Sequence, residues 1–310
     1  MPPELRKPDF FLVGAPKCGT TALHLHLARH PEIFLSAKEE TNHFASDLLR
    51  ADDPWRSEAA WLDLFREAGR ARRIGDASVF HLFSREAARG IRAFQPEARI
   101  LVALRDPVEW LPSYHSQMVW NGDETLRDLE AALEAEPARL RGEALPAHLR
   151  FPQRLYYSQV AAFSEQLERY FDAFGRDRVH VILFDELCSR SESVLRALLG
   201  FLEVDPSHCT GFQIANPNRQ LRSAAFSEFL KRPPAAIAGV VTRLLPPDRR
   251  MQLRRALRRW NSRAAERPPL EPALRARLCE RFRPEVEGLE RLLGRPLRGW
   301  CRPLASDPPG

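Results

Sequence analysis

Short apolar runs and longer amphipathic stretches alternate along the first two thirds of the chain. The runs with the length and composition of buried strands are 10–13, 32–35, 99–104 and 179–184, and 73–76 also has the pattern of a short strand end. Helical spacing of apolar side chains predicts helices over 21–28, 54–68, 84–94, 108–120, 158–174, 191–202 and 272–293. This alternation predicts an α/β fold, a three-layer sandwich whose central parallel sheet is flanked by helices.

The chain of 310 residues has room for one large α/β domain or two small ones, and it contains no internal repeat. Residues 123–152 are charged and contain prolines, which indicates a mobile helical insertion or lid. The C-terminal part is rich in Arg and Pro. We therefore expect a single domain over 1–310, with a core over about 9–225 and a helical extension over about 226–310.

Composition narrows the class of protein. The net charge is +6 and the pI is about 9.3, which fits an anionic ligand and does not by itself imply nucleic acid. No run of about 18 apolar residues occurs and no signal-peptide pattern is found, so we expect no transmembrane segment. The five cysteines lack metal-binding spacing, which favours reduced thiols, a cytoplasmic location and no metal site. The oligomeric state stays open.

The most informative motif follows the first apolar run. Residues 14–21 read Gly-Ala-Pro-Lys-Cys-Gly-Thr-Thr, and the two glycines stand in the frame of a phosphate-binding loop. A strand before the loop and a helix after it are the context in which backbone N–H groups bind phosphate. An NTPase carries Lys directly after the second Gly, where this chain has Thr20. The cation here is Lys17, inside the loop, which indicates chemistry other than ordinary triphosphate hydrolysis.

A second motif begins at Arg105, directly after the apolar run 99–104. An Arg at the carboxyl end of a strand can bind a phosphate through two charge-assisted hydrogen bonds. Ser113, two turns into the following predicted helix, can add a hydroxyl from the same side. Taken alone, Arg105-Asp106-Pro107 is equally consistent with a strand-to-helix cap, but its combination with the Lys17 loop favours a phosphate site.

The two motifs, in this order, resemble those of sulfotransferases that use 3′-phosphoadenosine 5′-phosphosulfate (PAPS), in the style of the bacterial and heparan-type branch. The resemblance covers about residues 9–225 and implies a P-loop-type fold. It implies that Arg105 and Ser113 bind the 3′-phosphate and that Lys17 stabilises the leaving phosphate as a catalytic residue. The residues implied to bind the 5′-phosphosulfate are Pro16, Lys17, Cys18, Gly19, Thr20 and Thr21.

The family's catalytic base lies four residues before a Phe, a spacing that selects Glu40, four residues before Phe44. Glu39 directly precedes Glu40, so the choice between the two stays open. His43 is a third candidate, because some branches of the family use His as the base. Considered alone, a Glu-Glu pair is also consistent with a solvated acidic turn.

Other segments resemble parts of the family fold that contact the acceptor or the nucleotide. Residues 75–78, Gly-Asp-Ala-Ser, resemble a segment near the acceptor, so Asp76, Ser78 and Glu39 are predicted to contact substrate, although a strand-end turn is the alternative. Tyr157 lies in a segment that resembles the one helping to bury the nucleotide, with a place in the core as the alternative. Arg219 and Arg222 lie in a loop that resembles one closing over the nucleotide, with a solvated basic loop as the alternative.

The sequence thus predicts an enzyme that transfers a sulfuryl group from PAPS to a hydroxyl or amine acceptor, with a Glu or His base and no required metal. Two alternatives remain open: a P-loop kinase or NTPase, and a non-catalytic protein that binds nucleotide or polyanion. The sequence leaves the acceptor open among small molecules, glycans and lipids.

Overall fold

The computed structural model describes residues 6–146, 149, 151–209, 219–221, 262–264 and 269–301, and single positions at 243, 249, 256, 257 and 260. The chain forms two compact units. The first contains residues 1–111, 150–216 and 271–310, and the second contains 112–149 and 217–270. In the described part, no helix is both long and apolar enough to cross a membrane.

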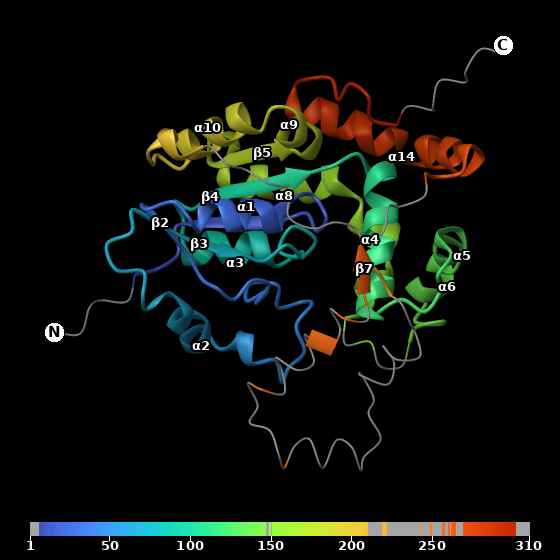
Figure 1. The fold of residues 1–310 in the computed structure, drawn as a ribbon, viewed down its shortest axis with the longest axis horizontal. Coiled ribbons are helices and arrows are strands. Elements are labelled where there is room, and N and C mark those ends of the chain that lie inside the picture. The colour runs from blue at the N-terminus through green and yellow to red at the C-terminus, as the bar shows by residue number, and fades with distance from the viewer. Residues whose placement is uncertain are drawn as a thin grey trace. The chain divides into compact units, whose positions relative to one another are not determined.

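A sheet of five parallel strands forms the core of the first unit, in the order β2-β3-β1-β4-β5 (Figure 1). The strands are β1 (Phe10–Gly14), β2 (Ile33–Leu35), β3 (Arg73–Ala77), β4 (Arg99–Leu104) and β5 (Val179–Leu183). The predicted parallel α/β sheet is confirmed, and each apolar run that was read as a strand forms one. Nearly every residue of β1 and β4 is buried, as expected for central strands covered on both faces.

Two glycines allow these strands to pack closely. A Cβ at Gly75 in β3 would lie 2.2 Å from the ring of Phe10 in β1, so only glycine fits beside that ring. At the end of β1, Gly14 has a φ of 153°, and a Cβ there would lie 2.6 Å from the carbonyl oxygen of Val79. The close contact at Gly14 brings the segment after β3 against the first residue of the phosphate loop.

Helices of the first unit connect and cover the strands. They are α1 (Thr20–Leu27), α2 (Glu58–Leu62), α3 (Ala87–Phe94), α7 (Tyr157–Val160), α8 (Phe163–Phe174), α9 (Phe184–Ser189), α10 (Ser191–Phe201) and α14 (Pro272–Leu293). Two predicted helices are interrupted. The stretch 54–68 divides around α2 because Asp53 and Ser57 each cap a new start, and 158–174 divides into α7 and α8.

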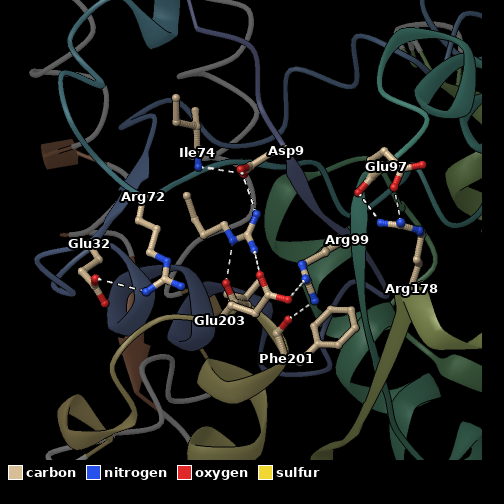
Figure 2. Close-up of polar contacts among 11 residues, drawn as sticks. Asp9, Glu32, Arg72, Ile74, Glu97, Arg99, Arg178, Phe201 and Glu203 are labelled. Carbon is tan, nitrogen blue, oxygen red and sulfur yellow. Dashed lines mark hydrogen bonds and ion pairs between the residues drawn. The ribbon is translucent and has the colours of Figure 1, made fainter.

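Charged side chains gather where the strands begin, at the edge of the sheet opposite the phosphate loop. Glu203 forms ion pairs with Arg73 (2.6 Å) and Arg99, the first residues of β3 and β4. Figure 2 shows Glu203 beside Arg99. Arg73 also lies 3.3 Å from Asp9, whose carboxylate accepts a hydrogen bond from the Ile74 N–H. These pairs join the amino ends of the strands to the residues after α10. Because Glu203 is half exposed, we assign the cluster a modest structural role.

The second unit contains most of α4 (Pro107–Asn121), with α5 (Leu129–Glu134), α6 (Glu136–Leu140) and an antiparallel pair of strands, β6 (Arg219–Leu221) and β7 (Ser262–Ala264). The insertion predicted over 123–152 does contain helices. It is held by a fully buried ion pair, in which Arg139 donates two hydrogen bonds of 2.7 and 2.9 Å to Glu124.

Candidate active site

Parallel strands place all their carboxyl ends at one edge of the sheet, and ligands of open α/β sheets bind along that edge. The predicted phosphate loop follows β1, and the segment with Asp76 and Ser78 ends and follows β3. Arg105 follows β4 and Phe184 follows β5. The topology therefore brings the main predicted site residues of the first unit to a single edge.

The loop after β1 is fixed by backbone contacts. The Ala15 N–H donates to the carbonyl of Ala103 in β4 (2.6 Å), and Trp110 donates its ring N–H to the Pro16 carbonyl (2.6 Å). Gly19 caps α1 in the left-handed conformation (φ 85°), and no side chain caps this helix. The first N–H groups of α1 therefore have no capping side chain, which is the arrangement that binds an anion at a helix N-terminus.

Two cations lie beside this loop. Lys17 is half-buried, with a φ of 64° that turns it within the loop. Arg105 stacks its guanidinium on Phe184, 4.7 Å from the ring centroid, and its Nε is buried without a hydrogen-bond partner among the described residues. Phe184 also packs against Gly19, since a Cβ there would lie 3.2 Å from the ring. An unpartnered, buried guanidinium N–H next to an uncapped helix fits a phosphate ligand.

Cys18, the loop residue after Lys17, is fully buried. Burial raises the pKa of its thiol well above the usual range, and the smaller opposing effects of Arg105 and Lys17 show that both cations are near it. Its Sγ lies 3.6 Å from the Pro16 carbonyl oxygen. A buried thiol with a raised pKa is a poor nucleophile, so Cys18 fills the loop instead of reacting.

The three candidate bases lie in the segment 38–44. Glu39 is half-buried, and burial, followed by the charge of Glu40, raises the pKa of Glu39 to about 7. Glu40 is exposed and adopts a left-handed backbone (φ 60°), with its N–H donating to the Ala77 carbonyl (2.8 Å). His43 places Nδ1 2.6 Å from the Trp55 carbonyl oxygen. The neutral His43 ring therefore donates from Nδ1 and keeps a lone pair on Nε2.

Asp76 and Ser78 lie beneath this segment, and their side chains are 2% and 0% exposed. The Ser78 hydroxyl accepts the Asn42 N–H (3.1 Å), and Asp76 accepts the ring N–H of Trp61 (3.1 Å). Burial raises the pKa of Asp76, while hydrogen bonds from its neighbours act in the opposite direction. The structure thus brings both residues to the candidate site but turns them toward the protein interior.

The remaining predicted residues are less directly placed. Thr20 is buried and Thr21 half-buried in the first turn of α1. Ser113 is buried in α4, within the second unit, and Tyr157 is fully buried at the start of α7. The side chain of Arg219 and the whole of Arg222 lie outside the described residues. The proposed nucleotide contacts of these residues stay predictions.

Sequence reasoning missed several residues that shape the site. Phe184 and Trp110 fix Arg105 and the phosphate loop, and Trp61 and His81 contact the segment with the candidate bases. Phe184 could have been found, because it directly follows a predicted strand at its carboxyl end. Trp61 and His81 gave no such signal, since their contacts join segments distant in sequence.

A pocket of about 380 Å³ with a mixed polar and apolar lining opens in the first unit near the same edge. It is lined by residues of 47–48, 83–85 and 153–169, among them Arg85, Gln153 and Gln159. α3 follows β3 and α8 precedes β5, so both helices begin at the edge of the sheet where the strands have their carboxyl ends. Residues in the first turn of α8 or just before either helix help to line the pocket. The side chains of Arg85 and Gln153 make no hydrogen bond or ion pair within the described residues.

A metal-dependent NTPase also needs an acid near the end of a strand, and the nearest such acids, Asp106 after β4 and Asp185 after β5, both have other contacts. Asp106 accepts the N–H groups of Val108 (2.9 Å) and Cys301 (3.1 Å). Asp185 accepts the ring N–H of Trp300 (2.9 Å). Across the described residues, no three or more His, Cys, Asp or Glu side chains gather in a way that could hold a metal ion.

Comparison with known proteins gives consistent matches. A family model described as the Sulfotransferase family matches residues 8–70, which contain the phosphate loop and the candidate bases. Carbohydrate sulfotransferase 15 from Rattus norvegicus and from Homo sapiens are each 26% identical over 250 residues, covering 64% of this chain and 44% of the relative. The chain therefore spans less than half the length of these curated relatives.

The solved structures extend the match to nearly the whole chain. The crystal structure of a sulfotransferase from Alicyclobacillus acidocaldarius is 28% identical, with a TM-score of 0.71, and the alignment covers 96% of this chain and 100% of that one. The fold predicted from the sequence is thereby confirmed as that of a sulfotransferase. The phosphate loop, the parallel sheet and these matches together make the chain similar to sulfotransferases in both sequence and fold.

Proposed function

We propose that this protein transfers a sulfuryl group from PAPS to a hydroxyl or amine of an acceptor. The observation that carries the proposal is that two anion-binding features occur at one edge of the sheet. One is the Lys17 loop, followed by α1, whose N-terminus has no capping side chain. The other is Arg105, whose buried Nε has no hydrogen-bond partner among the described residues. Two separate cationic positions suit a nucleotide with phosphate groups at both its 5′ and 3′ positions. The matches to sulfotransferases support the same reaction.

On this proposal, the loop holds the 5′-phosphosulfate and Arg105 holds the 3′-phosphate. Backbone N–H groups at the start of α1, with Thr20 and Thr21, bind the non-bridging oxygens. The guanidinium of Arg105 is kept in place by stacking on Phe184, which leaves its N–H groups available to a phosphate. Ser113 is expected to add a hydroxyl to the 3′-phosphate.

The transfer is an in-line displacement. The acceptor oxygen or nitrogen forms a bond to sulfur while the bond from sulfur to the bridging phosphate oxygen breaks. The electron pair of the broken bond stays on that oxygen, where the Lys17 ammonium stabilises the developing charge. The acceptor's proton passes to a base in the 39–43 segment, and the products are the sulfated acceptor and 3′-phosphoadenosine 5′-phosphate.

We assign the base to Glu40, with Glu39 and His43 as the residues to test against it. Glu40 is exposed, and its left-handed backbone is a strained conformation of the kind that is concentrated at functional sites. Glu39, with a pKa of about 7, is the strongest competitor, because a general base works best when its pKa is near the operating pH.

We propose a glycan as the acceptor. The two curated relatives are named carbohydrate sulfotransferases. The pocket offers the amides of Gln153 and Gln159 for sugar hydroxyls and the guanidinium of Arg85 for an anionic substituent. The second arginine of its lining, Arg169, pairs with Glu165. A lining that combines amides with charged side chains suits a saccharide better than an apolar lipid.

The experiment that tests this function is transfer of ³⁵S from labelled PAPS to a panel of acidic and neutral glycans, a lipid and a small phenol. Labelled glycan would support the proposal, and label on the phenol or lipid alone would overturn the acceptor assignment. The same protein with γ-labelled ATP and Mg²⁺ is the control. Phosphate transfer or ATP hydrolysis without any sulfuryl transfer would favour the kinase or NTPase alternative.

A further inference from the structure

A buried network of polar side chains holds four consecutive residues of the segment that carries the candidate bases. Thr41 donates its hydroxyl to Asp76 (3.4 Å), and the Asn42 N–H donates to Ser78 (3.1 Å). Phe44 donates its N–H to Nε2 of His81 (3.3 Å). Residues 76–81 therefore contact the segment through three hydrogen bonds, all of them from positions with at most 2% exposure.

Asp76 is the centre of this network. Its Oδ1 accepts both the Thr41 hydroxyl and the ring N–H of Trp61. Its Oδ2 lies 3.8 Å from Nδ1 of His81, and within the described residues neither atom has a hydrogen-bond partner. Because Nε2 of His81 accepts the Phe44 N–H, the neutral ring carries its proton on Nδ1, facing Asp76. Three donors thus point at a single buried carboxyl group.

The fourth contact reaches His43 through Trp61. The two rings stack with centroids 4.5 Å apart and an interplanar angle of 9°. The edge of Trp61 is fixed by its hydrogen bond to Asp76, and its face therefore fixes the plane of His43. Phe44 packs edge-on against Trp61 at 5.1 Å, which closes the cluster.

The segment needs such support because its backbone is strained. Glu40 and Asn42 both have left-handed backbones, with φ of 60° and 53°, and neither is glycine. Such conformations persist only where the surrounding structure holds them. Glu40 donates its N–H to the Ala77 carbonyl, and Asn42 donates its N–H to the Ser78 hydroxyl. Ala77 and Ser78 are the two residues that follow Asp76 in the sequence.

We infer that Asp76 is a positioning residue that, with Trp61 and His81, holds Glu39, Glu40 and His43 in the geometry needed for proton transfer. This inference rests on the proposed sulfuryl transfer. At 2% exposure, Asp76 acts on the acceptor through the base segment and not by contact, which differs from the substrate contact predicted from sequence. Sequence alone gave no sign of the link through Trp61.

The test uses two conservative variants and one matched control in the full chain. Asp76→Asn keeps the shape of the side chain but replaces one acceptor oxygen with a donor. Trp61→Phe keeps a ring against His43 but removes the N–H that binds Asp76. The control, Tyr170→Phe, removes a different buried hydrogen bond nearby, from the Tyr170 hydroxyl to the backbone carbonyl of His81 (2.9 Å), and leaves the side-chain contacts of the network in place.

We expect Asp76→Asn and Trp61→Phe to lower kcat for sulfuryl transfer by roughly 10- to 100-fold, because a misplaced catalytic group costs about that much. The dissociation constant for 3′-phosphoadenosine 5′-phosphate should change less than about threefold, since the phosphate loop is untouched, and Tyr170→Phe should keep kcat within about twofold. Hydrogen exchange of the Asn42 and Phe44 amides should accelerate in Asp76→Asn, while amides of β4 stay protected.

Several results would overturn the inference. They are an unchanged kcat in both variants, an equal loss in Tyr170→Phe, or a loss of nucleotide affinity that parallels the loss of kcat. If the wild type transfers no sulfuryl group, the proposed function fails, and hydrogen exchange alone decides whether Asp76 holds the segment. Unchanged exchange at Asn42 and Phe44 in Asp76→Asn would then refute the structural part. Trp61→Phe replaces Asp76→Asn in the exchange arm if that variant does not fold.

Discussion

The phosphate loop and the base segment lie at the same edge of one sheet, but they are built in different ways. The phosphate loop is a continuous stretch whose binding groups are largely backbone N–H groups at the start of α1. The base segment takes its shape from side chains more than 15 positions away in the sequence, chiefly Trp61, Asp76 and His81. The phosphate loop is thus encoded mainly by a local stretch of sequence, whereas the shape of the base segment depends on long-range contacts.

Removing the loop cation should give the largest effect on turnover. Lys17→Ala deletes a charge which, at about 4 Å and an effective dielectric of about 20, is worth about 4 kcal/mol in the transition state. We therefore expect kcat to fall by roughly 10³-fold with the fold intact. Single-turnover transfer from labelled PAPS, with circular dichroism as the folding control, measures this. Normal turnover in Lys17→Ala would remove Lys17 from the mechanism.

Removing the catalytic base should give the second largest loss of kcat. Glu40→Gln keeps the size of the side chain but cannot accept the proton, so kcat should fall by about 10²-fold or more while nucleotide affinity holds. Glu39→Gln and His43→Gln are the matched variants. Rapid-quench kinetics with each of the three identifies the base. A larger loss in Glu39→Gln would shift the assignment by one residue.

Arg105→Ala should act on binding more than on chemistry. It removes charge-assisted hydrogen bonds worth about 1.5–3 kcal/mol, so the preference for 3′-phosphoadenosine 5′-phosphate over AMP should shrink by roughly 10- to 100-fold. Phe184→Ala, which removes the stacking partner, should give a smaller loss in the same direction. Competition binding of the two nucleotides measures both effects. An unchanged preference in Arg105→Ala would contradict the 3′-phosphate assignment.

The smallest effect should appear in the pH dependence of kcat, which distinguishes Glu39 from Glu40 as the base. The raised pKa of Glu39 means that it gains a proton as the pH falls through about 7. With Glu40 as the base, that protonation removes only a neighbouring charge, and kcat should change less than about threefold across this range. A tenfold fall per pH unit below 7, absent in Glu39→Gln, would instead make Glu39 the base.

The contrast between the two regions also explains how much the sequence could predict. The five strands, α1, α14 and the Lys17 loop follow from local patterns, because apolar runs and a fixed glycine frame lie within short windows. The sequence predicts one helix over 54–68, yet caps at Asp53 and Ser57 divide this stretch. Its buried rings are those of Trp61 and Phe65. The burial of Asp76 and Ser78 depends on pairing between distant segments, which no local pattern reveals.

The central claim is that this edge of the sheet binds a nucleotide phosphorylated at both its 5′ and 3′ positions. Calorimetric titration of the wild-type protein with 3′-phosphoadenosine 5′-phosphate, beside AMP, ADP and ATP without metal, tests it most directly. We predict tight binding of the 3′-phosphorylated nucleotide and binding of the other three that is weaker by at least about tenfold. Preference for ATP, or equal binding of all four nucleotides, would contradict the account.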